Sequence, residues 1–137
     1  MTGLVVCLAV LAAASAFGVL HRRRDGRVRV AGSDGGERLT ADDLGGPLGE
    51  RATLVQFSSA FCAPCRATRR VLAEVTGMVE GVRHVEIDAE AQLGLVRRLH
   101  ILKTPTVLVL DADGSVVRRA SGQPRRADVI AALGAAV

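Results

Sequence analysis

Apolar and polar residues divide the chain into one long apolar run and a series of shorter segments. Residues 3–20 carry no charge and are rich in Leu, Val and Ala. A helix of about 18 residues is about 27 Å long, which is just enough to cross the hydrocarbon core of a bilayer. Arginines follow directly at positions 22–24, 27 and 29. We therefore predict a transmembrane anchor over residues 1–21 and a basic juxtamembrane linker over residues 22–37.

The charges around this run also predict its orientation. A secretory signal normally carries basic residues before its apolar core, and this chain has no Lys or Arg there. Ala14-Ser15-Ala16 does fit a small-residue cleavage pattern, so a cleaved signal is the alternative. Arginines behind the run favour an uncleaved anchor, because positive loops stay on the cytoplasmic side. We expect a single-pass protein of the cell membrane, inserted through residues 3–20, with its main domain in the cytoplasm.

Beyond residue 37, apolar residues recur with strand-like and helix-like spacing in turn. Residues 53–57 are typical of a short buried strand, and the unbroken run at residues 107–110 is typical of a central one. Helical spacing appears next at Val71, Leu72, Val75, Met78 and Val79. Further expected elements are strands over residues 82–87 and 115–120, a helix over 90–99, and a last helix that begins at Pro124 and buries Val129, Ile130 and Leu133. This order of strands and helices predicts an α/β domain over residues 38–137.

The segment before residue 50 carries weaker patterns. Residues 27–30 fit either an edge strand or a simple tether, and the Gly-rich residues 31–36 predict a flexible link. Thr40 followed by acidic residues indicates the start of a short helix, because a hydroxyl cap and first-turn carboxylates both favour a helix N-terminus. Glycines at positions 45 and 46 with Pro47 end that helix early.

Two cysteines stand where the strand of residues 53–57 gives way to a helix. In Cys62-Ala63-Pro64-Cys65 the first sulfur falls among unpaired backbone N–H groups at the positive end of that helix. Such a position stabilises a thiolate, which is the reactive form of cysteine. Cys65 lies one helical turn further along, close enough to form a disulfide with Cys62. The pair predicts a two-electron redox switch.

Other uses of two cysteines fit the sequence less well. A zinc site needs about four ligands, and the only further sulfur is Cys7, inside the apolar run. The three histidines are scattered. A structural disulfide over so short a loop would constrain the unfolded chain little. We therefore expect redox chemistry with no metal and no bound cofactor beyond the Cys62–Cys65 disulfide itself.

A second motif, Thr104-Pro105-Thr106, leads into the strand of residues 107–110. Together with Cys62-Ala63-Pro64-Cys65 and the order of elements, it resembles the thioredoxin family from about residue 38 to residue 137. The resemblance implies a thioredoxin fold, with a mixed central sheet flanked by helices. It further implies that Pro105 is cis and that the backbone of Thr104 pairs with an extended substrate segment. The substrate groove would consist of Phe61, Ala63, Pro64, Thr104 and Pro105.

The chain departs from that family at several positions. Phe61 replaces the usual tryptophan, and Ala63 replaces the glycine between the cysteines. Gln56 stands where thioredoxins carry a buried aspartate beneath the second cysteine, and His84 falls near the lysine that accompanies it. A neutral amide can hold a water molecule but cannot accept a proton from Cys65. We therefore expect one of three outcomes at Cys65: proton transfer through water, proton transfer with help from His84, or slower deprotonation.

The predicted function is the reduction of protein disulfides at the membrane surface. Cys62 attacks the target, Cys65 resolves the mixed disulfide, and an electron donor such as a thioredoxin reductase restores the dithiol. Two alternatives are an exported factor for cytochrome or disulfide maturation and a weakly catalytic binding module of the same fold. The net charge of +4 could suggest nucleic acid. However, three Phe and no Trp or Tyr leave no aromatic platform for bases, so nucleic acid is not an expected partner.

Overall fold

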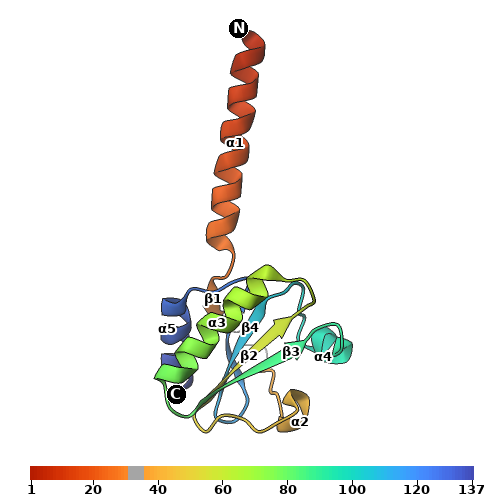
Figure 1. The fold of residues 1–137 in the computed structure, drawn as a ribbon, viewed down its shortest axis with the longest axis vertical. Coiled ribbons are helices and arrows are strands. Elements are labelled where there is room, and N and C mark those ends of the chain that lie inside the picture. The colour runs from red at the N-terminus through yellow and green to blue at the C-terminus, as the bar shows by residue number, and fades with distance from the viewer. Residues whose placement is uncertain (31–35) are drawn as a thin grey trace.

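The computed structural model describes residues 1–30 and 36–137; the link predicted over residues 31–36 lies almost entirely outside them. Helix α1, Thr2–Arg24, projects away from a domain that holds all the other elements (Figure 1). None of its residues is buried. Within the described residues, α1 is the one helix long and apolar enough to cross a membrane, a test that an N-terminal signal sequence also passes.

A five-stranded mixed sheet forms the centre of the domain, with the strand order β1-β5-β4-β2-β3. Strand β2 pairs with β3 in parallel, while the other neighbouring pairs are antiparallel. All seven residues of β2 are buried, and so are the first five of β4, which confirms both predicted interior strands. The strands are β1 Val28–Val30, β2 Ala52–Ser58, β3 Val82–Asp88, β4 Thr106–Asp111 and β5 Val116–Ser121.

Helices cover both faces of this sheet, because side chains of successive strand residues point to opposite faces. Leu54 and Val107 pack with the two longer helices, α3 (Ala63–Met78) and α5 (Arg126–Ala136). Their neighbours Val55 and Leu108 pack on the other face with α2 (Ala41–Leu44) and α4 (Leu93–Arg98). Burial on both faces is what requires the unbroken apolar runs of β2 and β4.

Strand β1 lies at the edge of the sheet, where Val28 pairs with Ala120 and Val30 with Arg118 of β5. Residues 28–30 therefore form the edge strand that was one of the two predicted alternatives, and not a simple tether. Part of the predicted linker belongs to the sheet, and only residues 25–27 separate α1 from β1. The predicted start of α2 is confirmed, since Thr40 and Asp43 form a reciprocal capping box. Gly45 then ends α2 with a left-handed φ of 67°.

Some predicted boundaries and buried positions were wrong. Helix α4 begins at Leu93 rather than at residue 90, because the Glu90 N–H donates to the Asp88 carboxylate in a turn, at 2.9 Å. Helix α5 begins at Arg126, two residues after Pro124. Ile130 is 43% exposed because the buried face of α5 runs through Val129, Ala132 and Leu133. Met78 is 59% exposed at the last position of α3, beside the buried face that contains Thr68, Leu72 and Val75.

Candidate active site at the start of helix α3

Cys62 and Cys65 are joined in a disulfide at the point where the loop after β2 enters α3. Cys62 is the N-cap residue of α3, and Cys65 lies in the first turn, with 5.2 Å between their Cα atoms. Cys62 is half-buried, whereas Cys65 is only 1% exposed. An incoming molecule can therefore reach the first sulfur but not the second.

Two hydrogen bonds end on the Cys62 sulfur. The backbone N–H of Cys65 donates to Cys62 Sγ at 3.2 Å, and the Thr104 hydroxyl donates to it at 3.9 Å. Ser59 Oγ lies 2.7 Å from Thr104 Oγ1. These donors and the N-terminus of α3 are placed where they would donate to a thiolate on Cys62 in the reduced protein. Ser59 was missed in the sequence, where nothing but its place shortly before the cysteines could have indicated it.

The loop before β4 faces the disulfide. The Thr104–Pro105 peptide bond is cis, as the family resemblance implied, and the Gly122 N–H donates to the Pro105 carbonyl at 2.7 Å. Pro64, Thr104 and Pro105 line one groove of about 1520 Å³. The other two predicted groove residues, Phe61 and Ala63, are not part of that lining.

Phe61 stands directly before the first cysteine with its side chain fully exposed. Its φ of 59° is in the left-handed region, which is unusual for a bulky residue and is held here by the turn into α3. An exposed aromatic ring beside a reactive sulfur is available for apolar contact with an approaching protein.

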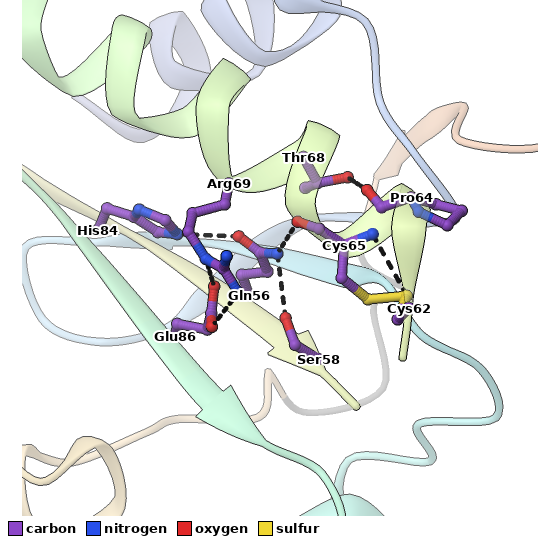
Figure 2. Close-up of polar contacts among 9 residues, drawn as sticks. All are labelled: Gln56, Ser58, Cys62, Pro64, Cys65, Thr68, Arg69, His84 and Glu86. Atoms are coloured by element: carbon purple, nitrogen blue, oxygen red, sulfur yellow. Dashed lines mark hydrogen bonds and ion pairs between the residues drawn. A yellow bond between two sulfur atoms is a disulfide. The ribbon is translucent and has the colours of Figure 1, made fainter. Parts of the chain in front are cut away.

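Gln56 lies beneath Cys65, as predicted, and is fully buried (Figure 2). Its side-chain nitrogen donates to the Cys65 carbonyl at 2.8 Å and to Ser58 Oγ at 3.0 Å. Its side-chain oxygen lies 3.1 Å from His84 Nε2. Because an amide oxygen can only accept, His84 Nε2 carries the proton in this arrangement. Gln56 thus contacts the backbone of Cys65 rather than its sulfur.

His84 comes from β3, and its burial favours the neutral form of the ring. Burial lowers the pKa of His84 from its usual value; Glu86 opposes this shift and Arg69 adds to it. Arg69 of α3 donates to both carboxylate oxygens of Glu86, at 2.6 and 2.7 Å, and so ties the helix to β3 (Figure 2). The pair was not predicted, since 17 residues separate its members.

Among the described residues, 1–30 and 36–137, no group of three His, Cys, Asp or Glu side chains is placed to hold a metal ion. The third cysteine, Cys7, is exposed on α1. What the site can do is form and break the Cys62–Cys65 bond, which transfers two electrons.

Comparison with known proteins agrees with this geometry. The Thioredoxin family model matches residues 47–135. The chain belongs to the thioredoxin family. It is 27% identical over 100 residues to a thioredoxin of Mycolicibacterium smegmatis, an overlap that covers 71% of this chain and 86% of that protein.

Solved thioredoxin structures share the fold. The oxidised mitochondrial thioredoxin 3 of Saccharomyces cerevisiae superposes with a TM-score of 0.55 at 16% identity, over 63% of this chain and 79% of that one. A mutant thioredoxin from Halobacterium salinarum gives 0.57 at 15% identity, over 64% and 75%. The predicted thioredoxin fold is confirmed. With Cys62 and Cys65 as its redox pair, this thioredoxin-family chain is a thiol–disulfide oxidoreductase whose family acts on protein disulfides.

Proposed function

We propose that this thioredoxin-family protein is a membrane-anchored reductant of protein disulfides. Residues 3–20 would span the cell membrane once, and residues 38–137 would form the catalytic domain on its cytoplasmic side. One observation carries the proposal: the groove beside the dithiol is lined both by Pro64 and Thr104 and by Val19 and Arg22 of α1. A substrate in that groove would lie at the level where α1 leaves the bilayer.

The proposed reaction uses only thiol chemistry. The Cys62 thiolate attacks one sulfur of the target disulfide, forms a mixed disulfide and releases the other target sulfur as a thiolate. Cys65 then loses its proton and attacks Cys62 Sγ, which releases the second target thiolate and leaves Cys62–Cys65 oxidised. Two electrons have passed to the target, and two protons complete its thiols. A dithiol or flavin-linked donor such as a thioredoxin reductase returns two electrons and two protons to the chain.

The roles of the surrounding residues follow from their positions. Thr104 and Pro105 would present the target segment, with the Thr104 backbone as the pairing strand. Phe61 and Ala63 would contact the target from the exposed side of the pair. Gln56 donates a hydrogen bond to the Cys65 carbonyl, and His84 forms a hydrogen bond with the Gln56 side chain. Both residues would therefore position Cys65 for proton transfer and would not themselves accept the proton from its sulfur.

The cytoplasmic location is proposed from charge. Arg22, Arg23 and Arg24 form the last turn of α1, and Arg27 and Arg29 follow within five residues. Moving so many arginines across a membrane is unfavourable. A cytoplasmic setting also favours a reductant, because that compartment keeps thiols reduced. If the protein were exported, maturation of cytochromes or secreted proteins would be the better interpretation of the same site.

Insulin reduction tests the enzymatic part of the proposal. We expect the full-length protein in detergent, with dithiothreitol as the electron source, to reduce insulin with many turnovers. Cys62→Ser should abolish turnover, whereas Cys65→Ser should accumulate a mixed disulfide because the resolving thiol is lost. Stoichiometric binding of insulin without turnover would instead indicate a binding module.

A further inference from the structure

Part of the groove beside the dithiol is lined by residues that lie outside the predicted catalytic domain of residues 38–137. Pro64, Thr104 and Pro105 line its catalytic side, and α1 contributes Val19, Arg22 and Arg23. Figure 1 shows α1 joining the domain at the same end as the start of α3. The helix that we propose as an anchor therefore also forms part of the substrate site.

Short-range contacts fix α1 beside the loop that faces the dithiol. Asp25 forms an ion pair with Lys103, the residue just before Thr104. The Gly26 N–H donates to the Ser121 carbonyl at 2.7 Å. Gly26 is buried with a φ of 73°, and a side chain there would overlap the backbone of Gln123, so the turn requires glycine. Asp25 and Gly26 thus hold the end of α1 at the edge of the groove.

The groove is strongly basic. Its lining includes two acidic residues, Asp25 and Asp128, and Asp25 is already paired with Lys103. None of the groove arginines takes part in the ion pairs found among the described residues. Arginine favours carboxylates because its planar group can donate two parallel hydrogen bonds. The basic side chains are Arg22, Arg23, Arg27, Lys103, Arg118 and Arg125.

We propose that this groove binds an acidic, extended segment of the substrate protein next to its disulfide, an inference that rests on the proposed disulfide reduction. A disulfide that reaches Cys62 must bring its flanking chain over Pro64 and Thr104. From there the groove continues between the arginines of α1, Arg118 of β5 and Arg125, the residue just before α5. Anionic lipid headgroups could also bind the α1 arginines, but such binding would leave the part of the groove at Pro64 and Pro105 unused. The continuity of the charged and catalytic surfaces favours a polypeptide.

Three disulfide peptides that differ only in their flanking residues test the inference. One carries four aspartates beside the disulfide, one four serines and one four lysines. Full-length protein in phosphatidylcholine nanodiscs, with dithiothreitol as donor, should reduce the acidic peptide with the highest kcat/KM after subtraction of the uncatalysed rate. We expect a difference of tenfold or more between the acidic and basic peptides at 50 mM salt. It should nearly vanish at 0.5 M, because salt screens exposed charges.

Paired variants identify the surface responsible. Arg22→Gln combined with Arg125→Gln should remove most of the preference for the acidic peptide. Arg70→Gln, on an exposed arginine outside the groove, should keep it. Equal rates with all three peptides would overturn the inference, as would a preference that survives the double change. Binding to phosphatidylserine vesicles with no peptide preference would likewise overturn it in favour of lipid. Failure to reduce any peptide would instead refute the proposed function.

Discussion

Cys62 and Cys65 differ sharply in their surroundings although they belong to one turn of α3. Cys62 is half-buried and receives hydrogen bonds from the Cys65 N–H and the Thr104 hydroxyl, whereas Cys65 is sealed beneath it. The structure therefore supports Cys62 as the nucleophile and Cys65 as the resolving thiol.

Iodoacetamide labelling across pH tests this division of roles. In the reduced protein, Cys62 should be modified first and at a lower pH than an ordinary cysteine, because its thiolate is stabilised by the helix start. Cys65 should react only slowly. The Cys62→Ser variant serves as control and should lose the fast phase. Preferential labelling of Cys65 would contradict the assignment.

Gln56 is expected to stabilise the fold as well as the site. Gln56→Glu keeps the side-chain length but loses the donor to the Cys65 carbonyl, which is then left without that partner. We expect the oxidised protein to lose about 1–3 kcal/mol of unfolding free energy, the usual cost of an unsatisfied buried group. Urea unfolding measures the change, with Gln92→Glu on an exposed residue as the matched control. An unchanged midpoint for Gln56→Glu would mean that its hydrogen bonds contribute nothing.

His84 should make stability depend on mildly acidic pH. Because burial lowers the pKa of His84 in the folded state, the unfolded chain binds a proton more tightly at this site. The contribution of His84 is therefore complete above about pH 6.5, its ordinary value, and is lost as the pH falls toward the lowered folded-state value. Urea midpoints at pH 7.5 and 5.5 should differ more for the wild type than for His84→Gln. Equal differences would show that His84 does not titrate in this way.

At the level of elements, α1 and β1 contribute differently to the stability of the domain. Helix α1 has no buried residue, so its removal should leave the domain intact. Strand β1 pairs with β5, and Val28 packs against the core that α3 and α5 cover. Removing β1 would expose the edge of β5 and part of that core.

Two truncated chains test this separation. A fragment of residues 25–137 should unfold at the same urea concentration as the full-length protein in detergent. A fragment of residues 37–137 should be less stable by on the order of 1–3 kcal/mol, from a few lost hydrogen bonds and one partly buried valine. Equal stability of the two fragments would show that β1 is only a tether.

The elements most visible in the sequence were those in which local pattern and tertiary burial agree. The apolar runs of β2 and β4, the Thr40 cap and the helical spacing after Cys65 each predicted the observed element. The predicted start of α4 was wrong because the Asp88 carboxylate accepts a hydrogen bond from the Glu90 N–H, which forms a turn ahead of the helix. Contacts between distant residues left no local pattern: Ser59 with Thr104, Arg69 with Glu86, and Asp25 with Lys103.

For the whole molecule, the short connection between α1 and β1 is the feature with the largest consequence. Residues 25–27 are too few to let the domain move far from the end of α1, and Asp25 and Gly26 are bonded to the domain itself. If α1 spans a bilayer, the Cys62–Cys65 pair stays near the lipid surface. Its compartment then decides whether it reduces cytoplasmic disulfides or matures exported ones.

Topology is the measurement that tests the membrane-anchored reductant most directly. Green fluorescent protein and, separately, alkaline phosphatase are fused after Val137 in the full-length chain. We expect fluorescence without phosphatase activity, in the membrane fraction and at uncleaved length, because the arginines behind the span stay in the cytoplasm. Replacement of Arg22, Arg23 and Arg24 by Glu should weaken or reverse this result. Active phosphatase with the native arginines, or an N-terminus near Phe17, would contradict a cytoplasmic membrane-anchored reductant.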